Sequence, residues 1–227
     1  MTKREILRKL QKLANSKNVA GMARFGINPK KTLGVAIPIL RQIAKQNGKS
    51  HKLAIQLWKS GIHEARILAS MIDEIEKVTE KQMDSWVRDF DSWDVCDQVC
   101  LNLFCQTKFA FKKCIQWSKI QEEFVRRAGF ALMACLAFKD KMTVDKEFIK
   151  FFPIIKKYAT DERNYVRKAV NWALRQIGKR NIILNKEAIK VAKEIYKFNN
   201  KASRWIAADA IRELESKAVQ HRLKSNH

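Results

Sequence analysis

The sequence reads RAGFAL at Arg127–Leu132, KAVNWAL at Lys168–Leu174 and RWIAA at Arg204–Ala208. In each stretch a basic residue opens an alanine-rich segment with the apolar spacing of a helix. The three basic residues are separated by 41 and 36 residues, a period typical of two-helix solenoid repeats such as HEAT. In such a solenoid they would form a basic line along one face. The alternative is that a basic all-helical chain produces such matches by chance.

The composition extends this interpretation to the whole chain. Of 227 residues, 46% are hydrophobic, and only 7 are Gly and 3 are Pro, which disfavours a loop-rich or β-rich fold. The apolar period is helical almost throughout, and no linker divides the chain. We therefore predict an all-α, HEAT-like helical-repeat solenoid with a concave basic face, a single domain over residues 1–227. The polar tail, residues 220–227, is expected to be frayed.

The expected helices end at glycines such as Gly48 and Gly61, and Gly178 follows a long one. They cover residues 3–14, 36–47, 50–60, 63–73, 79–90, 93–106, 109–117, 121–138, 144–158, 163–179, 186–198 and 201–214.

The charge is strongly positive and unevenly distributed. Lys and Arg number 46 against 23 Asp and Glu, a net charge of +23. Residues 1–60 carry +13, residues 61–120 carry −2, and residues 121–180 and 181–227 carry +7 and +5. Such an excess repels itself in the folded state and predicts a polyanionic partner, above all nucleic acid. A membrane surface or a ribosome is the alternative.

The sequence predicts neither a signal peptide nor a transmembrane helix. Its N-terminal stretch MTKREILRKLQKL lacks the apolar run of a signal peptide, and no run of about 18 apolar residues predicts a transmembrane helix. The five cysteines include no Cys-x-x-Cys pair, so they predict buried thiols rather than a metal site. We expect a cytoplasmic protein that uses no metal.

One candidate site is the beginning of the helix expected at residue 93. Ser92 is a candidate N-cap, and Trp93 and Asp97 are four residues apart, so that an aromatic ring and a carboxylate share one helix face. Alternatively, Trp93 belongs to the core and Asp97 is solvated or interacts with the helix dipole.

A second candidate surface combines Trp172 with basic residues. Lys168, Trp172 and Arg175 lie on one helical stripe, which suits a surface that faces phosphates and sugars. The alternative is a half-buried Trp172 between snorkelling cations. The pair Arg126 and Arg127 is a further candidate phosphate ligand, unless one of the two is merely solvated. The remaining tryptophans are expected in the core: Trp58, Trp86, Trp117 and Trp205.

Four segments resemble motifs of the AlkD-type DNA alkylation repair family. They are residues 90–97 (FDSWDVCD), 127–132 (RAGFAL), 167–175 (RKAVNWALR), and 23–26 (ARFG) with the later Leu33-Gly34. The resemblance extends over about residues 20–215. Each motif is weak alone, but their order and spacing together are specific.

The resemblance implies a fold of HEAT-like repeats that cradles duplex DNA and an alkylpurine DNA glycosylase activity. Members release N3- and N7-alkylated purines without flipping the base. By the motifs, Asp97 would be the catalytic carboxylate, Trp93 and Trp172 would contact the deoxyribose of the lesion, and Arg127 and Arg175 would lie near the DNA backbone. Arg126, Lys168 and Arg204 are our further candidates for DNA contacts.

The chain departs from the family after Leu33-Gly34. Where the family carries a polar pair near the lesion, this chain has Ala36 and Ile37, which cannot form side-chain hydrogen bonds. The departure favours an alternative, a non-catalytic HEAT-like module that binds DNA structures. A protein-binding scaffold and an RNA- or ribosome-binding protein are further alternatives. For the glycosylase we expect alkylated duplex DNA as partner, a monomer, and no small-molecule cofactor.

Overall fold

The computed structural model describes residues 1–225 and is helical from one end of that range to the other, without a strand in it. The chain forms two compact units, Met1–Lys108 and a second from Phe109 onward. We describe each unit by itself. Within the described residues, no helix is long and apolar enough to cross a membrane.

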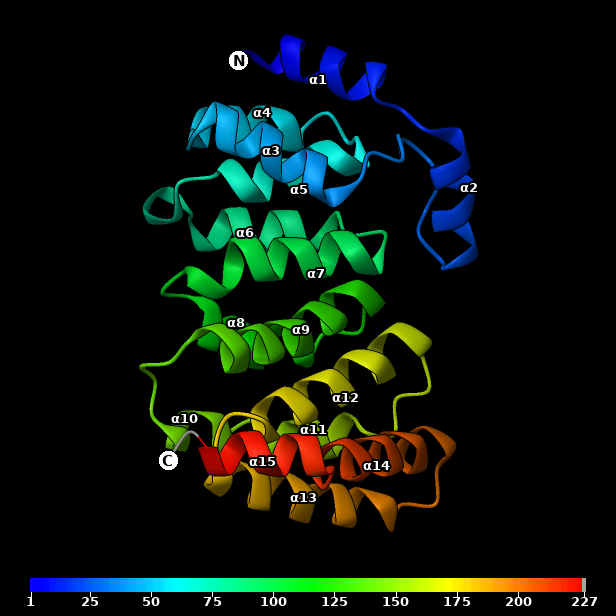
Figure 1. Ribbon diagram of the computed structural model, residues 1–227, viewed down its shortest axis with the longest axis vertical. Helices are drawn as coiled ribbons and strands as arrows, with labels where there is room; N and C mark the ends of the chain where they lie inside the picture. Colours follow the sequence, from blue (N-terminus) through cyan, green and yellow to red (C-terminus); the bar gives the residue numbers. More distant parts are fainter. Residues whose placement is uncertain (226–227) are drawn as a thin grey trace. The chain divides into compact units, whose positions relative to one another are not determined.

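The first unit consists of short helices (Figure 1). Its elements are α1 (Lys3–Lys12), α2 (Ser16–Arg24), α3 (Ile37–Asn47), α4 (His51–Trp58), α5 (His63–Ile72), η1 (Ile75–Lys77), α6 (Glu80–Arg88), α7 (Trp93–Asn102) and η2 (Phe104–Gln106). Helix α5 packs against α3, α4 and α7. Helix α2 stands to the side of the others (Figure 1) and buries none of its residues.

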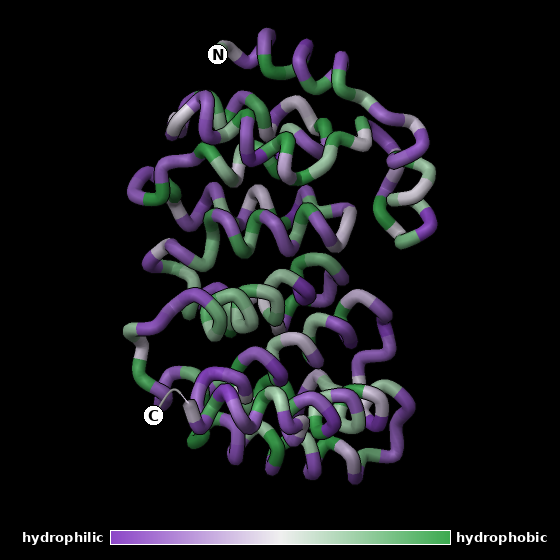
Figure 2. The backbone as a smooth tube through the Cα atoms, in the orientation of Figure 1, coloured by the Kyte–Doolittle hydropathy of each residue, from purple (hydrophilic) through white to green (hydrophobic). Residues whose placement is uncertain are grey.

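The second unit contains longer helices. Its elements are α8 (Ala110–Ser118), α9 (Glu123–Lys139), α10 (Asp145–Ile149), α11 (Phe152–Tyr158), α12 (Asn164–Gly178), α13 (Ile182–Tyr196), α14 (Lys201–Leu214) and α15 (Lys217–Ser225). Helix α12 packs against α9, α13 and α14. Along most helices, hydrophilic and hydrophobic residues alternate within each turn, whereas α9 is largely hydrophobic (Figure 2). Accordingly, every α9 residue from Val125 to Ala137 is buried.

Two glycines allow helices of the second unit to approach closely. A Cβ atom on Gly129 of α9 would lie 2.5 Å from the backbone nitrogen of Ser118 at the end of α8. At Gly178 it would lie 2.8 Å from side-chain atoms of Ala188 and Leu214. Gly178 is the last residue of α12. Gly178 thus lies at the end of a long helix, and its missing side chain lets that end pack closely.

Most helix positions confirm the prediction, and the differences have local causes. The expected helix at 144–158 is divided into α10 and α11, because Pro153 occupies the first turn of α11. Helix α2 was not expected, and Asn15 caps it by accepting from the backbone N–H of Asn18. The predicted frayed tail is wrong for residues 220–225, which belong to α15 and bury Leu223. Its last two residues, 226–227, lie outside the described range.

The predicted core residues are largely confirmed. Trp58, Trp86 and Trp117 are 3–4% exposed, and the rings of Trp58 and Trp86 stack at a centroid distance of 4.0 Å. The five cysteines are buried thiols. Trp205 is an exception: it is 39% exposed, so its assignment to the core was wrong.

Candidate functional site

The first candidate site lies at the beginning of α7. Ser92 is the N-cap and Trp93 the first helical residue, as predicted. Trp93 and Asp97 are both half-buried and share one face of the helix because they are four residues apart. The indole N–H of Trp93 donates to the carbonyl oxygen of Phe25 at 3.0 Å. Trp93 is therefore neither a core residue nor fully exposed. Its hydrogen bond to Phe25, which lies outside α7, fixes the orientation of the ring.

The loop after α2 is attached to the beginning of α7 by further hydrogen bonds. The backbone N–H of Asn28 donates to the Ser92 hydroxyl at 2.9 Å, so this hydroxyl does not cap its own helix. The side-chain amide of Asn28 donates to Asp91 at 2.8 Å. The loop thus holds the residues that immediately precede Trp93 in place.

A buried carboxylate organises the Leu33-Gly34 segment. Glu64 is 1% exposed and accepts hydrogen bonds from the backbone N–H groups of Leu33, Gly34 and Val35. Three backbone donors compensate for the desolvation of the charge. Gly34 has a φ of +75°, and a Cβ there would lie 2.4 Å from the carbonyl oxygen of Asn15. A side chain at position 34 would therefore be strained and would clash with the backbone of Asn15.

His63 adds an ion pair next to the candidate carboxylate. It is 4% exposed, and its Nε2 lies 2.8 Å from Asp94 Oδ2. Burial alone would lower the pKa of His63, but the hydrogen bond and charge of Asp94, with the charges of Glu64 and Asp91, raise it above its ordinary 6.5. This hydrogen-bonded pair joins α5 to α7, and protonation of His63 would strengthen it.

This pair predicts a pH dependence of stability. Because the pKa of His63 is raised on folding, its stabilisation is fully present below the unfolded pKa of about 6.5 and is lost as pH rises through the folded pKa. We expect the melting temperature of the wild type to fall more steeply above pH 6.5 than that of His63→Gln. Thermal unfolding between pH 6 and 9 measures this difference. The exposed His221→Gln is the control, and identical slopes for the wild type and His63→Gln would contradict the assignment.

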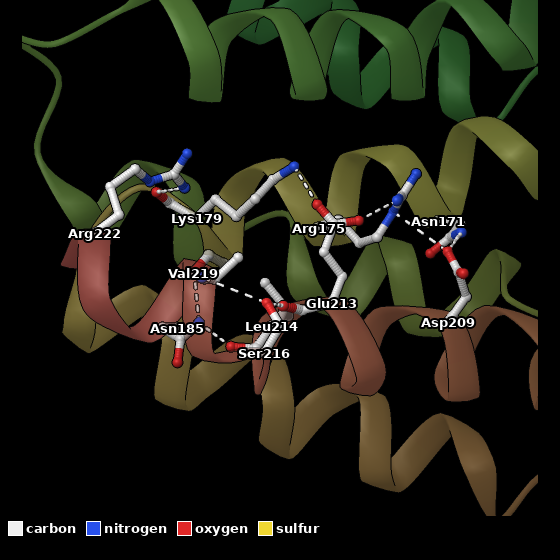
Figure 3. A network of polar contacts seen from close by, with 11 residues as sticks. Asn171, Arg175, Lys179, Asn185, Asp209, Glu213, Leu214, Ser216, Val219 and Arg222 are labelled. Carbon is white, nitrogen blue, oxygen red and sulfur yellow. Dashed lines mark hydrogen bonds and ion pairs between the residues drawn. The ribbon is translucent and has the colours of Figure 1, made fainter.

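The second candidate surface lies where α12 and α14 run side by side (Figure 3). Asn171 donates to Asp209 at 2.7 Å, and Arg175 forms an ion pair with Glu213. The partner is 38 residues further along the chain in both contacts. Glu213 also accepts from Lys179 at 2.5 Å. Burial would raise the pKa of Glu213, but Lys179 and Arg175 outweigh it and lower the pKa.

These contacts distinguish the members of the predicted stripe. Arg175 is 27% exposed, and its Nε also lies 3.6 Å from Asp209, so a phosphate would compete with two carboxylates for it. Trp172 is half-buried, which agrees with the alternative that it lies between two long basic side chains. Lys168 is exposed, and no hydrogen bond or ion pair of its ammonium group is found within residues 1–225. Lys168 is thus the cation of this stripe most available to an anionic ligand.

Arg126 and Arg127 are not surface cations. They are 7% and 5% exposed, which also excludes the alternative that one of them is solvated. Arg126 pairs with Asp161 at 2.8 Å, and Arg127 donates to the carbonyl oxygen of Tyr165 at 2.6 Å. Both arginines therefore join α9 to the beginning of α12, and the structure gives no support to a phosphate clamp at this pair.

The predicted basic line is exposed only in part. Arg127 and Lys168 are each the fifth residue of their helix and Arg204 is the fourth of its own, so the repeat positions are nearly equivalent. Lys168 and Arg204 are exposed, whereas Arg127 is buried. The Arg167 guanidinium lies over the exposed ring of Trp205 at 4.9 Å, a cation–π contact that the sequence did not reveal.

The departure from the family motif lies at the beginning of α3. Ala36 is the N-cap, is exposed, and provides no side-chain cap, and Ile37 is the first helical residue.

Sequence reasoning missed His63 and Glu64, whose partners lie about 30 residues away. Only their adjacency at a helix beginning could have drawn attention to them. No cluster of three or more potential metal ligands occurs among residues 1–225.

Comparisons with known proteins support the fold and give a family. One solved structure belongs to a new family of proteins related to the HEAT-like repeat DNA glycosylases, with affinity for branched DNA structures. It shares 19% identity, covers 94% of this chain and 95% of its own, and has a TM-score of 0.78. This likeness shows a HEAT-like repeat fold. A designed armadillo repeat protein in complex with a (KR)4 peptide matches only at a TM-score of 0.37, too low to bear on the fold.

A search of curated proteins finds no significant match. The sequence matches the family described as DNA alkylation repair enzyme over residues 6–214, which is most of the chain. The protein therefore belongs to the DNA alkylation repair enzyme family.

Proposed function

We propose that this protein is a DNA glycosylase that hydrolyses the N-glycosidic bond of cationic N3- or N7-alkylated purines in duplex DNA. One observation carries the proposal: in a member of the DNA alkylation repair family, Trp93 and Asp97 lie half-buried on one face of α7. A carboxylate next to a fixed aromatic ring suits a reaction that develops positive charge on a sugar.

The proposed mechanism needs one carboxylate. Departure of the base leaves positive charge on the deoxyribose, and Asp97 would stabilise that charge or orient the attacking water. An alkylated purine that is already cationic leaves as a neutral molecule, so no side chain has to protonate it. Trp93 would pack on the sugar, with its ring held by Phe25. Exposed cations such as Lys168 and Arg204 would hold the DNA through its phosphates.

The second candidate function is non-catalytic binding of branched DNA. Two observations favour it: Ala36 and Ile37 stand where the family carries polar residues, and the solved relative has affinity for branched DNA structures. In this alternative the basic surface binds DNA, and Asp97 has no role in chemistry.

Release of base from N7-methylguanine-containing DNA separates the two functions. Purified protein is incubated in excess over duplex DNA containing the lesion, and the free base is measured over time. The proposal predicts release. Binding of a four-way junction more tightly than the duplex, with no release from any alkylated DNA, would favour the binding module instead.

The basic residues predict a salt-dependent affinity for DNA. Log affinity should fall with log salt concentration by about 0.9 for each phosphate that the protein neutralises. Lys168→Ala should reduce this slope by about one unit and weaken binding to all sequences. Fluorescence anisotropy from about 50 to 200 mM salt measures the slope. Lys146→Ala, at an exposed lysine on α10, is the control, and a flat response of the wild type would point to a protein-binding scaffold.

A further inference from the structure

A hollow of about 320 Å³ opens on the first unit beside the turn between α4 and α5. Trp58 and Trp86 line it and stack with nearly parallel rings, 2° apart. Both side chains are almost fully buried. Because these rings are packed on each other, they form a rigid wall. The hollow does not include the residues of the candidate glycosylase site.

One cation and one anion of the lining neutralise each other. The Asp89 carboxylate accepts the indole N–H of Trp58 at 2.7 Å. Arg66 donates to the Asp89 carbonyl oxygen at 2.8 Å, and its Nη2 lies 3.7 Å from the Asp89 carboxylate. The guanidinium also lies over the Trp58 ring at 5.3 Å. Arg66 and Asp89 are thus fixed to each other and to the wall.

Two lysines remain without a counter-charge. Lys31 and Lys59 are exposed and line the hollow. Neither ammonium group has a hydrogen bond or ion pair with any residue from 1 to 225. The exposed Ser85 hydroxyl, also in the lining, has no hydrogen bond in the same range. Two positive charges and a hydroxyl group therefore line one concave surface.

The backbone directs Lys31 toward this surface. Lys31 has a φ of +58°, the left-handed region that non-glycine residues rarely adopt. Its carbonyl oxygen accepts the backbone N–H of His63 at 3.0 Å, which holds the residue in this conformation. The Lys31 ammonium lies 3.2 Å from the place that a Cβ atom would take at Gly61. The uncommon conformation and the absence of a side chain at Gly61 together let Lys31 reach across the turn.

We propose that this hollow is a phosphate-binding site, with Lys31 and Lys59 as the charge partners of the phosphate oxygens and Ser85 as a hydrogen-bond donor. Lysine binds phosphate as a mobile point charge with three donors. A metal cation is disfavoured by the surrounding positive charge, and an apolar ligand would leave the charged groups desolvated. A DNA backbone and a free nucleotide both present this chemistry. The backbone source rests on the DNA binding proposed above, whereas the site itself does not.

Nuclear magnetic resonance titrations of the full-length protein test the site. The probes are inorganic phosphate, a deoxynucleoside 5′-monophosphate and a short unmodified duplex, each at constant ionic strength set with chloride. We expect saturable shifts of the amide signals of Lys31, Gly61 and Ser85 with phosphate. The double variant Lys31→Gln/Lys59→Gln should weaken this binding at least tenfold.

Matched controls keep the test decisive. Lys52→Gln/Lys81→Gln removes two exposed lysines of the neighbouring helices α4 and α6 and should leave phosphate binding unchanged. Lys31→Gly, which accommodates the left-handed backbone, should reproduce the loss at Lys31 without strain. Absence of saturable shifts with phosphate, or an equal loss in the control double variant, would overturn the proposal.

The duplex titration shows whether the site binds the phosphates of a DNA backbone or those of a free nucleotide. If the duplex shifts the same amides and the Lys31/Lys59 double variant lowers its affinity, the site binds the DNA backbone. If phosphate and the mononucleotide saturate the site but the duplex does not bind, the site stands and the proposed DNA function fails. Both outcomes support the phosphate site, and they differ in what it recognises.

Discussion

If the proposed function holds, replacing Asp97 with asparagine should lower the single-turnover rate of N7-methylguanine release by about 10²- to 10³-fold, the usual effect of losing one preorganised electrostatic contact to a transition state. The substitution keeps the size of the side chain and removes its charge. DNA affinity should stay the same or rise slightly, because a negative charge near the phosphates is lost. Trp93→Ala and Trp172→Ala should slow release less, because in the proposed mechanism these rings would only position the sugar and carry no charge.

The matched control for this substitution is Glu76→Gln. Glu76 is an exposed carboxylate in the short helix η1 of the same unit, so the variant has the same net charge as Asp97→Asn. It should release base at the wild-type rate. If Asp97→Asn also retains the wild-type rate, Asp97 has no part in the chemistry.

The helices could be predicted because their determinants are local. An apolar period and a capping residue are contained within one segment, and most helix positions followed from them. One error arose where a local signal outweighed the apolar period, and another where burial in the fold outweighed the local polarity. Pro153 divides a continuous apolar pattern into two helices. The polar C-terminal stretch forms α15 because Val219 and Leu223 find partners elsewhere in the fold.

The candidate site was only partly predictable, because many of its contacts join residues that are far apart in the sequence. Trp93 and Asp97 share a helix face because of their spacing alone, which the sequence shows directly. The burial of Arg126 depends on Asp161, and the neutralisation of Arg175 depends on Glu213, 35 and 38 residues away. One sequence does not reveal which of its many carboxylates will meet which arginine. Basic residues were therefore easier to identify than to assign to DNA or to packing.

The single carboxylate also predicts a narrow range of substrates. The proposed mechanism assigns no proton donor beside Asp97, because Asp94, three residues away on α7, is paired with His63, so the departing base must carry its own positive charge. N3-methyladenine and N7-methylguanine are cationic as nucleosides and leave as neutral bases. Hypoxanthine, uracil and ethenoadenine would leave as anions or require a proton. General acid catalysis contributes about 10²- to 10⁴-fold, and the proposed mechanism should lack that contribution for these bases.

We therefore expect single-turnover release of N7-methylguanine to exceed release of hypoxanthine by at least about 100-fold from duplexes of otherwise identical sequence. Equal binding of both duplexes, measured by anisotropy with the Asp97→Asn variant, ensures that the difference lies in the chemical step. Comparable release rates for the two bases would show that a side chain donates a proton to the leaving group. His63 would then be the first residue to test, because it is hydrogen-bonded to Asp94 on α7 and its pKa is raised. In that case His63→Gln should abolish hypoxanthine release and leave N7-methylguanine release intact.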